Sequence, residues 1–441
     1  MAVLGQPPNS SGRLATVPTK DMFTKDDIFR KRCEVDYKCM RVVLSRRELL
    51  LATLVAPLLK SETRTREARV QILEAVWKNA RDLFYDPQMR GVDWVAVRDE
   101  FLPLAAASTS DDHLLSLLRA MLSRLRNSHI FLYTEEEWSW RGNVLPFCFD
   151  RVAGRVFVRS ALHSRDSTAR AALKFGDEVI AVDGISADEL RPLTLARLEP
   201  IKGNPNFGPS GSTAEVEIRR AGRSSIVEVA RVARPAGLET IVLERPTAKI
   251  ICLRLLTLGS RELPPTRLRQ IWEQVIHAQS LVLDLRNCVG GDSKVSNFIA
   301  GSFLGPSKRL FRTIPRPGSK SMEVLDQTDP QAPRFGGGVA VITNSNTESQ
   351  PEMLAAICRE YGCARVVGER TAGAFNGWTV AVDLPYSFAK YALPFARSVS
   401  PNGVEYEGRG VEPDEPAVDT VEDFAMGHDR PLLAALRCLG A

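Results

Sequence analysis

The chain has 441 residues, of which 44% are hydrophobic and 25% are charged, and it carries a net charge of +5. This composition is typical of a globular protein with two or three domains, and it excludes a largely disordered chain and a bundle of membrane helices. The charge is weak for this length, and no dense run of Lys and Arg with interleaved aromatic residues occurs, so we do not expect nucleic acid as a partner.

The first part of the chain, residues 1–66, is predicted to be an N-terminal extension. Residues 1–39 are polar and show little periodicity, whereas Ser45-Arg46-Arg47 is followed by the apolar run Leu49–Leu59. That run is too short to span a bilayer stably, but residues 40–60 resemble a twin-arginine export signal. The resemblance implies a periplasmic or other extracytoplasmic protein. The alternative is an amphipathic helix lying against the next domain of a cytoplasmic protein.

Residues 67–140 are predicted to form a helical subdomain. Between residues 67 and 87, apolar side chains recur every three or four positions, which marks one buried face of a helix. These side chains are Val70, Leu73, Trp77, Ala80 and Phe84. A second, capped helix is expected in TSDDHLLSLLRAMLSRL. It ends at Asn127-Ser128-His129, and IFLYT then predicts a short strand.

Residues 145–235 have the alternation of a compact β-rich module. GRVFVRSAL and EVIAV predict strands with a short helix between them, and STAEVEIRRAGRSSIVEVARV predicts a hairpin that turns at Ala221-Gly222. The segment ALKFGDEVIAVDG, Ala172–Gly184, resembles a PDZ domain of the bacterial type. Such domains bind extended peptide ends by strand addition, so the resemblance implies a peptide partner. A purely structural β-module would show the same alternation.

From about residue 246 to residue 437, predicted strands and helices alternate. Strands are expected in KIICLRLLTL, SLVLDLRN, GVAVITN and ARVVGER, and helices in TRLRQIWEQVIHA, SKVSNFIAGSFL and QPEMLAAICREYG. This order predicts an α/β domain with a largely parallel sheet. Ligands of such sheets sit at the carboxyl ends of the strands. Because LRNCVGGD and ITNSNTES both follow a strand directly, we expect the two loops to share the functional edge.

Ser349 stands at the start of the last of these helices. Ser349-x-x-Glu352 matches a capping box, in which the serine caps the helix and the glutamate returns the bond. A serine in this position can also serve as a nucleophile. The glycine pair Gly290-Gly291 follows a strand, where its backbone N–H groups could form an oxyanion hole or where the pair could simply turn the chain.

Candidates for a general base and an orienting acid are also present. Of the five histidines, only His129 lies at a helix-to-strand junction beside a hydroxyl, that of Ser128. A neutral imidazole there could accept the proton of a nucleophile. Glu407 could orient such a site through a hydrogen bond. Glu405 and Glu412 are chemically equal neighbours, and an exposed acidic loop is the alternative.

The eight cysteines are scattered, and no Cys-x-x-Cys pair or Cys/His cluster offers a metal site. We therefore expect neither a metal ion nor another cofactor. Cys358 and Cys363 are close enough in sequence for a disulfide, but buried free thiols are the interpretation that we favour.

Residues 67–437 resemble the tail-specific, or C-terminal processing, serine peptidase family. Seven segments carry the resemblance in the family's order: FYDPQMRGVDW, LLRAMLSRLRNSH, LKFGDEVIAVDG, LVLDLRNCVGG, VITNSNTESQPEM, VVGERTAG and GRGVEPD. The resemblance implies a helical N-terminal part, an inserted PDZ domain and a crotonase- or ClpP-like α/β core. It also implies a serine endopeptidase that cleaves peptides or unfolded polypeptides, with the substrate's C-terminus as one means of recognition.

The resemblance assigns roles to individual residues. Ser349 falls on the nucleophile, and the implied oxyanion donors are the N–H of Gln350 and that of Gly290 or Gly291. Ala374 occupies the position at which one branch of the family has its catalytic lysine, so a Ser/Lys dyad is excluded at that place. The other branch resembles the tricorn core protease and uses serine, histidine, a second serine and glutamate.

The tricorn-like branch fits the remaining candidates. His129 follows Ser128 as the base follows its helper serine in that branch, and Glu407 precedes a Gly-Val-x-Pro-Asp element. The implied tetrad is Ser349, His129, Ser128 and Glu407. The alternative function is that of a catalytically silent protein that binds peptides through the PDZ domain or hydrophobic ligands. The oligomeric state is not predicted.

Overall fold

A computed structural model of the chain describes residues 64–441, apart from residues 141–142, 162–172, 191–203, 210 and 234–239. The expected export signal at residues 40–60 lies outside the described residues, and so does the short helix expected between the first strands of the β-rich module. No helix in the described part of the chain is both long and apolar enough to cross a bilayer.

Three helices form the first part of the described chain, and they pack around one apolar cluster. The helix expected over residues 67–87 is confirmed. Its buried face contains Leu73 and Ala80 from the predicted stripe, together with Ile72 and Val76. The helices are α3 (Arg66–Leu83), α4 (Trp94–Ala107) and α5 (Asp111–Ser123).

A three-stranded antiparallel sheet completes this helical cluster. The expected strand IFLYT is β1 (Phe131–Thr134), which pairs with β18 (Ala389–Pro394), and β18 pairs with β17 (Thr379–Asp383). Tyr391 and Leu393 of β18 are buried in the same apolar cluster as the three helices. Two strands from late in the chain therefore pack with its first helices and lie beside the segment that carries His129. Helix α6 (Glu135–Trp140) follows β1.

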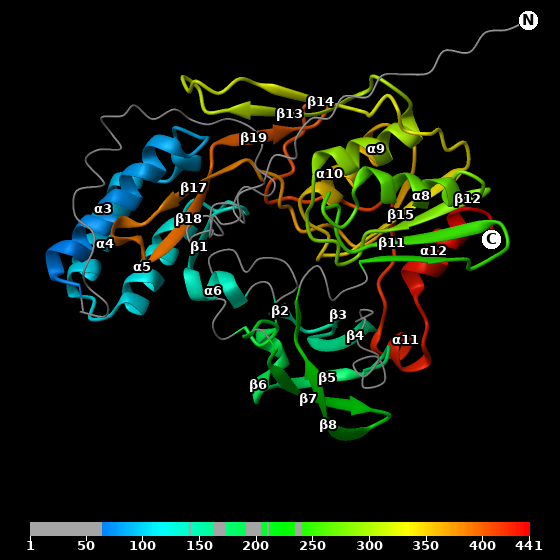
Figure 1. Cartoon of the computed structure of the whole chain (residues 1–441), viewed down its shortest axis with the longest axis horizontal. Helices are drawn as coiled ribbons and strands as arrows, with labels where there is room; N and C mark the ends of the chain where they lie inside the picture. Colours follow the sequence, from blue (N-terminus) through cyan, green and yellow to red (C-terminus); the bar gives the residue numbers. More distant parts are fainter. Residues whose placement is uncertain (1–63, 141–142, 162–172, 191–203, 210, 234–239) are drawn as a thin grey trace, which may run out of the picture. The chain divides into compact units, whose positions relative to one another are not determined.

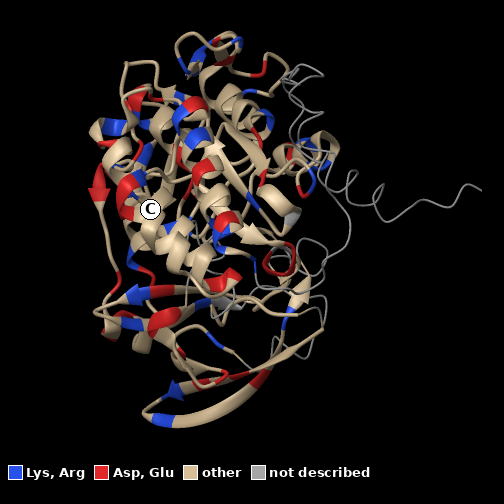
Figure 2. Ribbon diagram, turned by 90° about the vertical axis from the view of Figure 1, so that its left-hand side faces the viewer, with Lys and Arg blue, Asp and Glu red and all other residues tan. Residues whose placement is uncertain are grey.

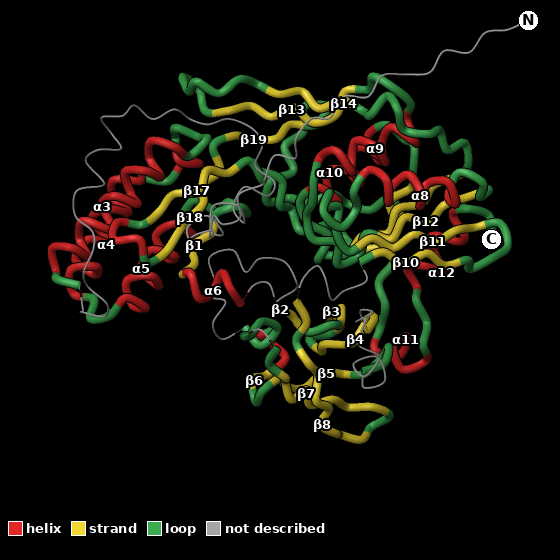
Figure 3. The backbone as a smooth tube through the Cα atoms, in the orientation of Figure 1, coloured by secondary structure: helices red, strands yellow, loops and turns green. Residues whose placement is uncertain are grey.

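The β-rich region that follows is an antiparallel sheet with the order β3-β4-β5-β7-β8, in which β6 pairs with β5. The predicted hairpin is confirmed, because β7 and β8 pair along their whole length and turn at Ala221-Gly222. The strands close over an apolar cluster of their own, and Figure 3 shows them as one group. They are β3 (Phe147–Val152), β4 (Arg155–Ala161), β5 (Glu178–Val182), β6 (Ile185–Ser186), β7 (Thr213–Arg220) and β8 (Arg223–Ala230). The short strands β2 (Asn143–Val144) and β9 (Val232–Ala233) pair with each other in a separate two-stranded sheet.

The α/β part contains a six-stranded sheet with the order β10-β11-β12-β15-β16-β20. All neighbouring pairs are parallel except β10 with β11, so the prediction of a largely parallel sheet is confirmed. The strands are β10 (Ile241–Glu244), β11 (Ile250–Leu255), β12 (Ser280–Asp284), β15 (Gly338–Thr343), β16 (Arg365–Gly368) and β20 (Glu415–Pro416).

Helices cover both faces of this sheet because alternate residues of a strand point to opposite sides. Leu281 and Leu283 of β12 join the apolar cluster that includes α8, α9 and α10. Val282, between them, packs in the cluster that includes Ala434 and Ala435 of α12. Figure 1 shows α8, α9 and α10 on one side of the strands and α12 on the other. The helices are α8 (Pro265–Val275), α9 (Ser293–Leu304), α10 (Gln350–Glu360) and α12 (Arg430–Cys438).

Several described elements were not among those predicted from the sequence. Strands β13 (Arg309–Pro315), β14 (Val324–Gln327) and β19 (Ala396–Val399) form an antiparallel sheet with the order β14-β13-β19. Helix α11 (Val421–Met426) precedes α12. Figure 2 shows acidic and basic residues interspersed along the ribbon. Cys358 is free and buried, as expected, whereas Cys363 is free but partly exposed.

Candidate active site

Ser349 lies beyond the carboxyl end of β15, at the N-terminus of α10. Its backbone has φ 63° and ψ −122°, a combination that residues other than glycine rarely adopt and that marks local strain. The residue is partly exposed. A strained, accessible serine between a strand and a helix is the arrangement in which a nucleophile elbow presents its hydroxyl.

The two loops that were expected to share one edge of the sheet lie side by side. Gly290 N–H donates to Glu348 O at 3.0 Å, and Glu348 N–H donates to Cys288 O at 3.1 Å. A Cβ atom added to Gly290 would stand 4.0 Å from Ser349 Oγ. The glycine loop therefore borders the hydroxyl of Ser349, as the parallel sheet predicted.

The backbone donors near Ser349 distinguish Gly290 from Gly291, which the resemblance left as alternatives. Because Gly290 N–H already donates to Glu348 O, it is not available as an oxyanion donor. Among the described residues, Gly291 N–H has no backbone acceptor. Gln350 is the first residue of α10, so its N–H has no partner within the helix. Gly291 and Gln350 therefore supply the two free donors.

Only glycine fits at position 291. Its φ is 152°, and a Cβ atom there would lie 2.3 Å from the backbone carbon of Leu258. No side chain can relieve this contact, since the obstacle is backbone. The close approach holds the exposed Gly291 N–H at the edge of the sheet.

Ser128, His129 and Glu407 form one chain of hydrogen bonds. Ser128 Oγ lies 2.7 Å from His129 Nδ1 and donates to Glu407 Oε2 at 2.9 Å. Ser128 N–H also donates to Glu407 Oε1 at 2.7 Å. Ser128 and Glu407 are buried. The carboxylate therefore holds both the backbone and the hydroxyl of the residue that precedes the histidine.

This chain determines which nitrogen of His129 carries the proton. A hydroxyl has one hydrogen, and Ser128 gives it to the carboxylate of Glu407, which can only accept. His129 Nδ1 must then donate its proton to Ser128 Oγ. Nε2 is left with its lone pair, which is the state that a general base requires.

Gly377 lies next to both reactive side chains. A Cβ atom at this glycine would stand 3.3 Å from His129 Nε2 and 3.6 Å from Ser349 Oγ. Both atoms therefore border the same small volume beside Gly377. The structure brings His129 and Ser349 together although they lie far apart in the sequence.

The acidic neighbours of Glu407 have other partners. Glu405 forms an ion pair with Arg397, and Glu412 lies 3.5 Å from Arg370. Glu407 accepts hydrogen bonds from Ser128. Its Oε2 also accepts hydrogen bonds from the N–H groups of Phe375 and Asn376, both at 2.9 Å. The contacts separate three glutamates that were chemically equal in the sequence.

Glu352 supports the nucleophile from within α10. Ser349 N–H donates to its Oε2 at 2.8 Å, which is the glutamate half of the predicted capping box. The carboxylate also accepts Thr371 Oγ1 and Gly373 N–H, both at 2.6 Å, and Ala374 N–H at 2.8 Å. Burial raises the pKa of Glu352 to about 7, although these hydrogen bonds lower it.

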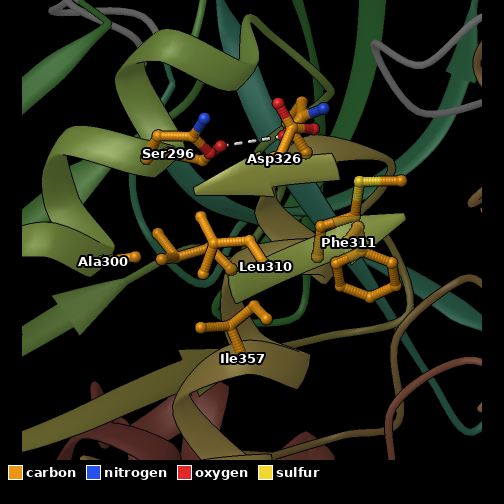
Figure 4. Close-up of a pocket in the computed structure, with 10 residues that line it drawn as sticks. Ser296, Ala300, Leu310, Phe311, Asp326 and Ile357 are labelled. Carbon is orange, nitrogen blue, oxygen red and sulfur yellow. Dashed lines mark hydrogen bonds between the residues drawn. The ribbon is translucent and has the colours of Figure 1, made fainter. Parts of the chain in front are cut away.

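A mostly apolar pocket opens next to Gln350. On the polar side of this pocket, Ser296 Oγ donates to Gln350 Oε1 at 2.8 Å. Figure 4 shows the apolar side chains of Ala300, Leu310, Phe311 and Ile357 around the pocket, together with Asp326. The full lining is Ser296, Asn297, Ala300, Leu310, Phe311, Asp326, Gln350, Met353, Leu354 and Ile357.

Comparison with known families agrees with this geometry. Residues 250–417 match the model of peptidase family S41, and residues 65–123 match the tricorn protease C1 domain. Residues 250–417 therefore carry the similarity to peptidase family S41. The S41 match covers the α/β part that carries Ser349 and Glu407, and the C1 match covers helices α3 to α5.

Two curated relatives are similar to most of this chain at 23–27% identity. Putative tricorn protease homolog 2 of Streptomyces coelicolor is 27% identical over 403 residues, which cover 82% of this chain and 32% of that protein. The chloroplastic carboxyl-terminal-processing peptidase 1 of Arabidopsis thaliana is 23% identical over 376 residues, covering 80% of this chain and 73% of the relative. The chain thus spans about a third of the length of the tricorn homologue.

A solved structure supports the mixed α/β fold. The photosystem II D1 C-terminal processing protease has a TM-score of 0.53 to this chain at 18% identity. The match covers 85% of this chain and 97% of that protein. At this identity the likeness speaks for the fold alone.

Sequence reasoning missed Gly377 and the segment 371–376 of this S41 domain. The only local signal was the motif VVGERTAG, which contains Thr371 and Gly373. Residues 373–376 act through backbone N–H groups, which carry no side-chain signature.

Proposed function

We propose that this chain is a serine endopeptidase of family S41 that hydrolyses peptides or unfolded polypeptides. The observation that carries the proposal is the convergence of His129 Nε2 and Ser349 Oγ at Gly377. The hydrogen-bonded chain from Glu407 through Ser128 to His129 supports it, since it leaves the lone pair of Nε2 on the side of the ring away from Ser128.

The chemical steps follow from the order of these contacts. His129 Nε2 takes the proton of Ser349 Oγ as Oγ forms a bond to the peptide carbonyl carbon. The negative charge that develops on the carbonyl oxygen is stabilised by the N–H groups of Gly291 and Gln350. The C–N bond then breaks, and His129 gives its proton to the leaving amine. Water, deprotonated by His129, hydrolyses the acyl ester and restores Ser349.

Helix α10 contributes a further electrostatic term. Gln350 begins the helix, so the partial positive charge of the helix N-terminus faces the developing oxyanion. Ser349 therefore serves both as the first residue of a capping box and as the nucleophile.

The pocket beside Gln350 suits an apolar side chain of the substrate. Its walls are formed largely by aliphatic and aromatic residues of α9, α10 and β13. Since Gln350 directly follows the nucleophile, a side chain next to the scissile bond is the natural occupant. We propose that this pocket favours small apolar residues at that position.

The domain arrangement is proposed from the same resemblance. Residues 1–66 form an N-terminal extension, residues 67–140 a helical subdomain, residues 145–235 an inserted PDZ domain and residues 246–437 a crotonase- or ClpP-like core. The antiparallel order β3-β4-β5-β7-β8 and its separate apolar cluster support an inserted module. The PDZ domain would bind an extended peptide such as the C-terminus of a substrate.

An extracytoplasmic location is proposed from the twin-arginine-like segment at residues 40–60. Mass spectrometry of the mature N-terminus from the native host tests it. Loss of the first 60 or so residues agrees with export, and an intact residue 1 contradicts it.

A fluorophosphonate probe tests the proposed activity. Wild-type protein is expected to react at Ser349, and S349A is expected to remain unlabelled. A peptide-library digest followed by mass spectrometry should show cleavage by wild type only, with H129A slower by about 10²- to 10⁴-fold. Pure, folded wild-type protein that neither reacts nor cleaves would instead be the catalytically silent binder of peptides or hydrophobic ligands.

A further inference from the structure

Glu352 is a buried carboxylate for which the peptidase mechanism gives no direct role. It is completely buried, and it lies on α10, one turn after the nucleophile. Each of its oxygens accepts two hydrogen bonds, Oε1 from Thr371 and Gly373 and Oε2 from Ser349 and Ala374. An arrangement of four donors around one buried acid is far more than a helix cap needs.

The partners of Glu352 include no positive charge. Within the described residues, Glu352 takes part in no salt bridge, and its four donors are a hydroxyl and three backbone N–H groups. Only a carboxylate can accept from all four. A protonated carboxyl group, or an amide, would place its own hydrogen against donors and lose part of the set.

The segment after Thr371 connects Glu352 to the other buried acid of the site. The N–H groups of Gly373 and Ala374 donate to Glu352, and those of Phe375 and Asn376 donate to Glu407. Four consecutive backbone donors are thus shared between two carboxylates. We call residues 373–376 the bridging segment.

The bridging segment links nucleophile and base through short contacts. At one end Glu352 holds the backbone of Ser349, and at the other Glu407 holds Ser128, whose hydroxyl contacts His129. Gly377, which borders both reactive atoms, follows the segment directly. A shift of Glu352 therefore moves Ser349 relative to His129.

We propose that ionised Glu352 is a positioning residue, which keeps the Ser349 hydroxyl in line with His129 by holding Ser349 and the bridging segment together. The inference rests on the proposed peptidase function, because it concerns the alignment of that nucleophile and base. Protonation of Glu352 weakens this alignment. Burial raises the pKa of Glu352 to about 7, so the change in protonation falls near neutral pH.

Other titratable groups of the network lie beyond the direct partners of Glu352. On α10 and on residues 371–374, the atoms that contact Glu352 are backbone N–H groups and the Thr371 hydroxyl. Glu407 and His129 are the ionisable groups at the other end of the bridging segment. A test must therefore change Glu352 without touching His129.

Thr371 provides that test. Its hydroxyl accepts Val411 N–H at 2.8 Å and donates to Glu352 at 2.6 Å. T371V removes a donor that favours the ionised acid, whereas T371S keeps it. We expect T371V to move the acid limb of the fluorophosphonate labelling rate to higher pH and to lower that rate at pH 6 by about tenfold, a shift of one pKa unit. T371S should follow wild type.

The substitution E352Q is expected to lower the labelling and turnover rates more than T371V does. Loss of alignment should slow labelling and kcat by about 100-fold, as a misplacement near 1 Å does, while KM changes less than about threefold. The matched control is D423N, which disrupts the capping box of α11 and should leave both rates unchanged. Circular dichroism of each variant confirms folding.

The outcomes separate the two proposals. Wild-type protein without Ser349-dependent labelling defeats the peptidase and this inference with it. If wild type is labelled and E352Q is labelled within about threefold of that rate, the positioning role is overturned and the peptidase proposal stands. The same holds if the acid limb of T371V coincides with that of T371S. If E352Q does not fold, the comparison of T371V with T371S decides whether Glu352 has the positioning role.

Discussion

Helices α10 and α11 begin with the same local motif but in opposite surroundings. Ser349 and Glu352 form a capping box on α10, and Thr420 and Asp423 form one on α11. Thr420 has an extended backbone with φ −98°, whereas Ser349 has φ 63°. Asp423 has a cation, Arg430, beside it, while the described partners of Glu352 are all uncharged donors.

The difference shows which of the two capping boxes has a role beyond stabilising the end of its helix. Burial alone would raise the pKa of Asp423, but Thr420 and Arg430 hold it below its usual value. For Glu352, burial prevails and raises the pKa to about 7. The capping box of α11 provides hydrogen-bond partners for the start of that helix, and its Asp423 forms an ion pair with Arg430, which is partly exposed. The α10 box keeps a strained backbone and a costly buried acid, which is the pattern expected where function is served.

Removal of the two cap hydroxyls should separate the boxes most strongly. S349A is expected to lower kcat/KM by at least about 10⁴-fold, because the nucleophile is lost. T420A should cost about 1 kcal/mol of stability, since its hydroxyl accepts Asp423 N–H, and leave kcat/KM unchanged. Peptide hydrolysis and urea unfolding measure the two effects. Normal turnover by S349A would show that both serine and threonine are simple caps.

Two glycines extend the comparison. A methyl group at Gly377 would stand 3.3 Å from His129 Nε2 and 3.6 Å from Ser349 Oγ, so G377A is expected to lower the labelling rate by about 10- to 100-fold with little loss of stability. Gly427 ends α11 with φ 73°. G427A should instead cost about 1 kcal/mol through backbone strain, with no kinetic effect. Equal labelling rates for G377A and G427A would contradict the placement of the reactive atoms.

The two acids should affect stability in opposite pH ranges. The folded pKa of Glu352 lies above its ordinary value of 4.5, so its contribution to stability is fully present below pH 4.5 and is lost as pH rises through about 7. The shift corresponds to a loss on the order of 3 kcal/mol. Asp423 has a lowered pKa, so its contribution is present above its ordinary value of 3.8 and is lost as pH falls.

Urea unfolding between pH 3 and pH 8 measures both effects. The stability difference between wild type and E352Q should change between pH 4.5 and 7, and that between wild type and D423N should change below pH 4. Activity should rise over the range in which Glu352 loses stability, because the ionised form aligns the site. Parallel profiles for wild type and E352Q would show that Glu352 does not titrate in this window.

The sequence was sufficient for those elements whose partners are close in the chain. Apolar periodicity and strand-helix alternation identified α3, the β7–β8 hairpin and the parallel sheet, since local spacing determines which face of an element is buried. The same reading predicted that the loops before Gly290 and Ser349 meet at one edge. The S41 motifs added the choice of Ser349, His129, Ser128 and Glu407 as candidates.

Tertiary structure decided the contacts that depend on distant segments and on backbone atoms. Strand β18 pairs with β1 from early in the chain, and no local pattern encodes that pairing. The N–H of Gly290 is used by Glu348, and Gly373 to Asn376 contribute through backbone donors that every residue except proline possesses. The sequence gives the chemistry of each side chain. Only the folded chain determines which backbone N–H groups are left without a backbone acceptor.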